Sequence, residues 1–528
     1  MNNIKFKCDI IKSFITKIKI LLKDKYIKLI LILFFFLFVL FGRPFISGDG
    51  YGYFGILDNV LSYGTVTTTS FDKYVDAPWT FQKLKYHDNP EYAPLYYHGG
   101  AISWAPFVII TRSLNSIGPV NEINNIFLTY TAFNFTDGMG VLLATSFMGL
   151  LSVIMTYKLL CMKFSPFVSF ISSFLAFFGT YAFYYTFMEP SFVNVPEMFF
   201  ITLALYLFVK VINTGLTITK RSFIYLVLVG LSFGLAITCR VSSVFVLGVL
   251  GISVIYIFKK KFIKPALAIG LGLILPLLSM LAFSYLAYGD PFISGMSYFS
   301  WYPLFSIKYF SLLNILFDPI RGLFLWSPIT LVSLISIVIG IKNNLKIKNI
   351  LIFSLAIIAL IILFYSFWYC WWGGGSIGQR FLIVLTPFWA LGIAIFFNYV
   401  LEKYKNLKKI KIALVILTVL ICFFHIFVGK SYLVMDKSKA TYTKYEWEQN
   451  NPNSISPLEQ YTIFDVLSSG ITNFNLNSIG GFISLPKNLI MRVDLDGRRN
   501  FPQLVYYYYK VKVENLNVKD LELQKDNK

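Results

Sequence analysis

Long apolar runs separated by short polar segments recur along most of this 528-residue chain. A run of about 20 apolar residues is long enough to cross the hydrocarbon of a bilayer as a helix. We therefore expect an all-α polytopic membrane protein with about eleven spans. The expected spans lie near residues 26–43, 138–158, 166–187, 192–212, 222–239, 241–258, 265–287, 327–341, 349–368, 381–401 and 412–428.

The polar segments between these runs differ in charge. The N-terminal segment and every second loop are rich in lysine, whereas the short loops on the other side hold only Arg240, Lys308, Arg321 and Arg380 as cations. Lysine and arginine are retained on the cytoplasmic side of membrane proteins. This pattern predicts a multi-pass protein of the cell (inner) membrane, with a cytoplasmic N-terminus and an extracytoplasmic C-terminus.

Composition excludes other classes of protein. Charged residues make up 14% of the chain, against about 25% in soluble domains, which argues against a soluble enzyme or a disordered chain. The formal net charge of +21 suggests nucleic acid at first sight. Because the cations follow the topology and form no interleaved basic patch, we expect a bilayer and no nucleic acid as the partner.

Two parts are predicted, a transmembrane domain over 1–428 and an extracytoplasmic domain over 429–528. The transmembrane domain includes a long first outer loop at about 44–137, where prolines and the apolar stretch 101–114 predict short surface helices. In the C-terminal part, alternation over 489–497 and 506–513 predicts strands, with a hairpin at Asp496-Gly497. This part is expected to be small and to contain β-structure.

The segment Gly48-Asp49-Gly50-Tyr51-Gly52-Tyr53-Phe54 directly follows the first expected span. Apolar surroundings at this interface would raise the pKa of Asp49, and its carboxylate suits a general base for an acceptor hydroxyl. Tyr51 and Tyr53 are candidates for substrate binding. The alternative is an aspartate that only caps a tight turn, since Asp-Gly is ordinary there.

Three arginines form the second candidate group. Arg240, Arg321 and Arg380 are lone cations on the side where topology disfavours them. Guanidinium groups bind phosphate bidentately, so together they predict a phosphate site. For any one of them alone, an arginine that extends from the end of a span to the interface is the favoured interpretation, and only the three together favour a site.

The segment from Tyr365 to Gly375 holds the third candidates, Trp371 and Trp372, followed by three glycines. Tryptophan at an interface often only anchors the protein. The glycine run also permits irregular backbone close to a ligand, so both rings are candidates for binding the substrate's sugar.

Weaker signals concern acids and histidines. Glu189 and Glu197 flank or enter the fourth expected span, where an acid is a functional candidate by default. His87, Asp88, Glu91 and His98 have no spacing typical of a metal site, so we expect no metal and keep His98 as a substrate-binding candidate. The five cysteines are scattered and predict no disulfide framework.

These features resemble the integral-membrane C-type (GT-C) glycosyltransferases, in particular the bacterial relatives of protein O-mannosyltransferases and of the aminoarabinose transferase that modifies lipid A. The resemblance covers about residues 26–428. It rests on the acid after the first span, the long first outer loop and the number of spans. Three segments carry it as well, Gly234-Leu235-Ala236 up to Arg240, Arg321-Gly322-Leu323-Phe324 up to Pro328, and Trp371-Trp372-Gly373-Gly374 up to Phe381.

The resemblance implies a transferase that moves a sugar from a polyprenyl-phosphate donor to an acceptor hydroxyl on an envelope lipid, polymer or protein. It implies Asp49 as the catalytic acid and Arg240, Arg321 and Arg380 as the lipid-phosphate site, with no cofactor. Several relatives have a second acid directly after the first, where this chain has Gly50. The partner carboxylate then comes from Glu189 or Asp88, or Asp49 works alone.

Two other functions remain open from the sequence. A flippase or transporter of a lipid-linked glycan would place ionisable residues in mid-membrane, where this chain offers little besides Glu197 and His425. A non-catalytic partner in an envelope assembly would tolerate loss of the outer acid and arginines.

Overall fold

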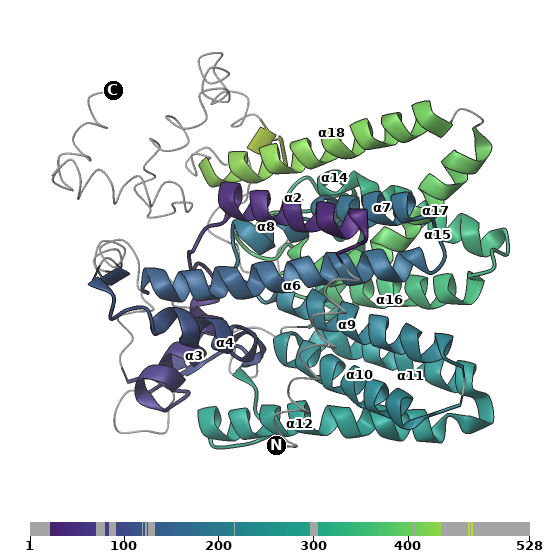
Figure 1. Ribbon diagram of the computed structural model, residues 1–528. Coiled ribbons are helices and arrows are strands. Elements are labelled where there is room, and N and C mark those ends of the chain that lie inside the picture. The colour runs from purple at the N-terminus through teal and green to yellow at the C-terminus, as the bar shows by residue number, and fades with distance from the viewer. Residues whose placement is uncertain are drawn as a thin grey trace, which may run out of the picture.

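The structure is a computed structural model that describes residues 22–69, 80–83, 91–118, 120–121, 124, 133–215, 217–295, 305–404, 407–434, 463–464 and 466–467. Within these residues the protein is mostly helical, and its long helices lie side by side in one bundle (Figure 1). The long helices are α2 (Lys25–Phe41), α6 (Phe135–Cys161), α7 (Pro166–Gly179), α9 (Asn194–Asn213), α10 (Lys220–Cys239), α11 (Val244–Phe258), α12 (Ile263–Tyr288), α15 (Pro328–Lys342), α16 (Lys348–Ser366), α17 (Thr386–Lys403) and α18 (Leu407–Val434).

Eight of these elements are long and apolar enough to cross a membrane, so the chain is a multi-pass membrane protein. They are α6, α9, α10, α11 with the preceding turn η3 (Val241–Ser243), α12, α16, α17 with the preceding turn η7 (Arg380–Leu385), and α18. A helix also lies at each of the other expected spans, but α2, α7 and α15 have only 17, 14 and 15 residues. The count of eleven spans therefore stays a prediction.

The expected span 166–187 is not one continuous helix. It is divided into α7 and the short α8 (Ala182–Phe187), because Tyr181 between them has a left-handed φ of 60°. Irregular backbone is tolerated at membrane depth only where protein buries it. Every residue from 171 to 188 is buried, and Thr180 bonds Thr386 of α17 at 2.8 Å, so the break is covered.

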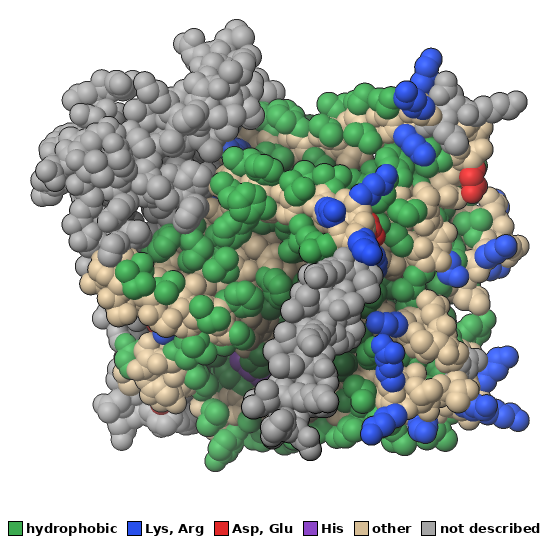
Figure 2. Space-filling view, in the orientation of Figure 1, with side chains coloured by type: hydrophobic (Ala, Val, Ile, Leu, Met, Phe, Trp, Pro, Cys, Tyr) green, Lys and Arg blue, Asp and Glu red, His purple; other side chains and the backbone are tan. Residues whose placement is uncertain are grey.

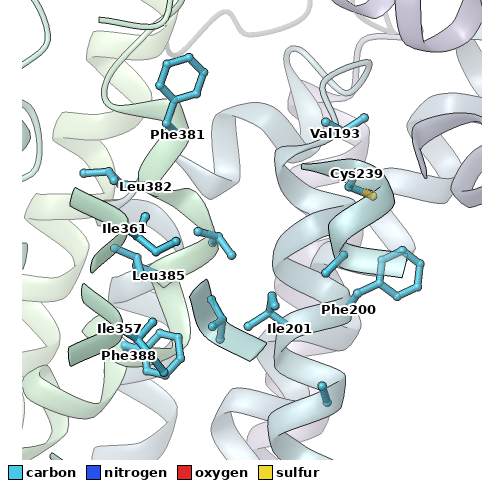
Figure 3. Packing of buried hydrophobic residues seen from close by; sticks show 14 of the residues in the cluster. Val193, Phe200, Ile201, Cys239, Ile357, Ile361, Phe381, Leu382, Leu385 and Phe388 are labelled. Atoms are coloured by element: carbon cyan, nitrogen blue, oxygen red, sulfur yellow. The ribbon is translucent and has the colours of Figure 1, made fainter. Parts of the chain in front are cut away.

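Close helix packing depends on small residues at the contacts. α10 packs along α12 and α9, and a Cβ atom at Gly230 or Gly272 would overlap a backbone carbonyl of the facing helix. Such contacts suit membrane helices, where dispersion replaces the hydrophobic driving force. The largest buried cluster joins α9 and α10 to α16 and α17, and Phe381 lies at one end of it (Figure 3).

Most of the lysines and arginines visible in Figure 2 lie toward one end of the bundle. They include those at the turns that join α9 to α10 and α11 to α12. We call this the basic end. Its orientation toward the cytoplasm stays a prediction.

The opposite end carries α3 (Gly50–Tyr63) and α4 (Gly99–Arg112), as the first outer loop predicts. That loop also contains a two-stranded antiparallel hairpin of β1 (Phe81–Lys83) and β2 (Tyr92–Pro94), which the sequence did not predict. Two short helices, α13 (Leu312–Phe317) and α14 (Leu323–Trp326), precede α15. The strands predicted for 489–513 lie outside the described residues.

Candidate active site

The Asp49 carboxylate lies at the start of α3, a few residues after the end of α2. It makes no side-chain capping bond to α3, so the interpretation as a mere helix cap is wrong. Instead, Asp49 Oδ2 accepts from Arg380 Nη2 at 2.7 Å. The Asp49 side chain is 16% exposed and that of Arg380 is 8% exposed, which makes this a largely buried ion pair.

The electrostatics of Asp49 differ from the sequence prediction. Burial acts to raise the pKa of the carboxyl, but the charge and hydrogen bond of Arg380, a hydrogen bond from Tyr96 and the charge of Arg240 hold that pKa below the ordinary value of 3.8. The prediction of a raised pKa is therefore wrong, because it took the apolar surroundings into account without the guanidinium groups. Asp49 is a carboxylate at neutral pH and accepts hydrogen bonds.

Close packing explains why a glycine follows Asp49. A Cβ atom at Gly50 would overlap the side chain of Ser191, and one at Gly52 would lie 2.6 Å from the Tyr96 ring. These distances are shorter than a carbon contact permits. A second acid at residue 50 would therefore separate α3 from the loop before α9, and Asp49 is the one carboxylate that this turn accommodates.

Arg240 reaches the same place from the turn between α10 and α11. It has extended backbone with φ −150°, which directs the chain from α10 into η3. Its Nη1 donates to Tyr365 Oη at 3.2 Å, and its guanidinium lies 4.4 Å from the centre of the Phe381 ring. Its Nε is buried and has no hydrogen-bond partner among the described residues.

Arg380 begins η7 and is held between aromatic rings. Its guanidinium lies 4.8 Å from the Phe192 ring centre and 5.2 Å from that of Phe381. Nη2 is bonded to Asp49, while Nε and Nη1 are buried and unpartnered in the described part of the chain. In the glycine run before it, Gly373 has a φ of +78°, and a Cβ there would lie 3.2 Å from Arg380 Nε.

Two phenols complete the surroundings of Asp49. Tyr96 donates to Asp49, and Tyr53 bonds Arg240. The two rings stack with their centres 4.4 Å apart. Burial raises the pKa of both phenols, so they stay protonated and act as donors. Tyr53 was predicted from the sequence as a site residue, whereas no sequence signal indicated Tyr96.

Glu197 lies close to Arg240, on α9 and fully buried. Its Oε1 accepts from Ser243 Oγ at 2.7 Å and from Ser242 Oγ at 3.5 Å, and its charge acts on Arg240. The structure therefore brings Asp49, Tyr53, Glu197, Arg240 and Arg380 together from four separate segments of the sequence. We call these five residues the acid–arginine cluster.

Arg321 has a different set of neighbours. It is fully buried, and its guanidinium lies 5.1 Å from the Trp326 ring centre and 5.9 Å from that of Tyr432. Glu189 follows α8, and its charge acts on Tyr184 and Tyr185. The structure thus places these two predicted residues around α8, α14 and α18.

The remaining aromatic candidates are packed in the core. Trp371 and Trp372 are each 2% exposed, with ring centres 6.0 Å apart, and Tyr51 packs on Phe133 at 5.4 Å. None of these three rings presents an open face for a sugar in this structure.

His98 directly precedes α4, makes no side-chain capping bond and contacts α12. Its Nε2 lies 3.0 Å from Ser279 Oγ, and its ring stacks on Phe283. Because Ser279 donates its own proton to the Pro276 carbonyl, His98 Nε2 is the donor in this pair. Burial lowers the pKa of His98 to about 4. Among the described residues no cluster of three His, Cys, Asp or Glu side chains could hold a metal ion, while His87 and Asp88 lie outside them.

Among known proteins, only solved structures are found to be similar to this chain. No family model and no curated protein matches the chain. Two solved structures of the oligosaccharyltransferase of Archaeoglobus fulgidus are similar. The apo form gives a TM-score of 0.44 at 13% identity, and the complex with an inhibitory peptide and a dolichol-phosphate gives 0.47 at 14%. They match 74% and 77% of this chain, which spans only 52% and 55% of their length.

Proposed function

We propose that this protein is a membrane glycosyltransferase that moves a sugar from a polyprenyl-phosphate donor to an acceptor hydroxyl at the extracytoplasmic face. The observation that carries the proposal is the acid–arginine cluster. It places the largely buried carboxylate of Asp49 beside two guanidinium groups whose Nε and, in Arg380, Nη1 atoms have no hydrogen-bond partner among the described residues. An arginine pair beside a carboxylate suits a phosphate leaving group next to an attacking hydroxyl.

In the proposed reaction, the acceptor oxygen attacks the anomeric carbon as the bond from that carbon to the phosphate oxygen breaks. Asp49 orients the hydroxyl and takes its proton as the new glycosidic bond forms. The low pKa of Asp49 makes it a weak base in the resting enzyme, so the proton transfers late, when the attacking oxygen has become acidic. A single displacement inverts the configuration of the sugar.

Arg240 and Arg380 would bind the phosphate and stabilise the charge that returns to it with the bonding electrons. Arg240 is held by Tyr365 and Tyr53, and Arg380 by Asp49. Nε of Arg240 and Nε and Nη1 of Arg380 have no partner among the described residues and would serve the ligand. Arg321 is proposed to contribute to lipid-phosphate binding, Glu189 to catalysis and His98 to substrate binding, as the sequence predicts. The buried rings of Trp371 and Trp372 are left out of the proposed sugar site.

The function is tested with purified protein, labelled polyprenyl-phosphate sugars and extracted envelope acceptors. Transfer predicts that polyprenyl phosphate is released and that the label appears in the acceptor fraction. Label that instead crosses the bilayer of sealed vesicles as the intact donor, without release, would identify a flippase and contradict the proposal.

A further inference from the structure

We propose that Tyr365 is a positioning residue, which sets the orientation of Arg240 through a one-way chain of hydrogen bonds that ends on Glu197. The inference rests on the proposed function in one respect, namely that Arg240 binds the phosphate of the donor. The chain of contacts itself stands on the geometry of four segments, the turn from α10 to α11, α16, α9 and η7.

The direction of the bonds follows from the chemistry of the two ends. Arginine can only donate, so Arg240 Nη1 donates to Tyr365 Oη at 3.2 Å. The Tyr365 hydroxyl proton then serves Ser242 Oγ, 2.9 Å away. Ser242 and Ser243 in turn donate to Glu197 Oε1 at 3.5 and 2.7 Å. Every bond therefore runs from the guanidinium toward the carboxylate.

The ring of Tyr365 is fixed as firmly as its hydroxyl. It stacks on Phe381 with ring centres 4.6 Å apart and planes 11° apart. Phe381 lies against the guanidinium groups of both Arg240 and Arg380. Because Tyr365 is 5% exposed and Glu197 is fully buried, the chain lies in a low-dielectric interior where hydrogen bonds orient strongly.

This arrangement explains the placement of Glu197 better than contact with a substrate does. Its Oε1 is occupied by two serines, and the serines belong to the same turn that carries Arg240. The carboxylate thus fixes the turn, Tyr365 fixes the guanidinium, and the remaining N–H groups of Arg240 are presented beside Asp49.

The test is binding of polyprenyl phosphate, without sugar, to purified full-length protein. Tyr365→Phe keeps the ring and removes only the hydroxyl, and it should weaken binding about tenfold, the effect of one lost bond to a charged group. Ser242→Ala should weaken it several-fold. Tyr157→Phe removes a buried hydroxyl that bonds Asp24 near the basic end, and it should leave binding unchanged.

The background variants decide whether Tyr365 acts through Arg240. Tyr365→Phe is added to protein that already carries Arg240→Gln, where it should weaken binding no further. The same result is expected with Arg240→Lys, which serves if Arg240→Gln does not fold. An equal loss in every background, or no loss in the wild-type background, would overturn the inference.

Thermal unfolding is a second measurement, and it tests the role of Tyr365 even if the proposed function is wrong. If the wild-type protein binds no polyprenyl phosphate, the proposed function fails, but thermal unfolding still tests the pair. The Tm losses of Tyr365→Phe and Arg240→Gln should then be less than additive in the double variant. Strict additivity would overturn the positioning role.

Discussion

Asp49 and Arg380 are separated by 331 positions in the sequence, yet Asp49 Oδ2 and Arg380 Nη2 lie 2.7 Å apart. The pair joins the start of α3, which follows the first long helix, to the start of η7, which leads into α17. Arg240 and Glu197 extend the same site from α10 and α9.

Removing Arg380 should change the pH dependence of activity. In the wild type the pKa of Asp49 lies below 3.8, so its carboxylate stays ionised as pH falls from 7 to 5. Arg380→Gln removes the guanidinium that offsets the effect of burial on Asp49, so the pKa of Asp49 should rise above the ordinary value. As pH is lowered, the Arg380→Gln variant should therefore lose activity at a higher pH than the wild type does, which a pH–rate profile measures.

Arg380→Lys is the matched control for this change, because it keeps the charge and loses the fork of donors. Its pH profile should stay close to that of the wild type, while phosphate binding weakens. Identical acid limbs in wild type and Arg380→Gln would show that Asp49 does not set the profile.

Arg112 should be a strong determinant of stability. It donates to Asp58 of α3 and to Asp137 of α6, each at 2.6 Å, and both carboxylates are almost fully buried. Arg112→Met leaves two buried acids without their cation, which should destabilise the protein by about 2–4 kcal/mol. Thermal unfolding in detergent should show the loss, and Arg221→Met, an exposed arginine of α10, should change stability little.

His98 should make stability depend on pH. Its pKa is about 4 in the folded protein and about 6.5 when unfolded, so the unfolded chain binds more protons between these values. Stability should rise with pH across that window and fall on acidification from about 6.5 to 4, by up to about 3 kcal/mol for this group. In His98→Gln the fall in Tm over the same range should be smaller, and an unchanged fall would remove His98 as its cause.

Gly50 should tolerate no side chain, since a Cβ there would overlap Ser191. Gly50→Ala should lower activity by displacing Asp49 from Arg380, and Ser191→Gly should restore part of it by making room. Gly248→Ala is the control, because no atom of the described residues lies within 4 Å of a Cβ at that helical position. A fully active Gly50→Ala would show that the close contact does not position Asp49.

Much of the site could be predicted because lone charges are conspicuous in an apolar chain. Asp49 closely follows the first expected span, and Arg240 and Arg380 are lone cations next to apolar runs on the side predicted to be poor in cations. The helix ends bring the three together. Tyr96 and Tyr365 could not be found this way. They are two of 34 tyrosines, and only packing decides which hydroxyl meets an arginine or a carboxylate.

The pKa of Asp49 and the break at Tyr181 are two further features that could not be predicted from the sequence. The sign of the pKa change depends on the partner guanidinium groups, which are distant in sequence. The division of 166–187 depends on a left-handed Tyr181 and on the Thr180–Thr386 contact, neither of which an apolar run reveals. Hydropathy predicts where chain is buried in the membrane, and tertiary contacts decide where its helices end.

The most direct test of the central claim is release of polyprenyl phosphate by Asp49→Asn, measured with the donor and acceptor that the wild type uses. Asn keeps the size of the side chain and removes the proton acceptor, so release should fall by about a hundredfold or more while Tm changes little. Asp24→Asn, which removes a carboxylate paired with Lys158 near the basic end, should retain full activity. Equal release by wild type and Asp49→Asn would contradict the account and remove Asp49 from the reaction.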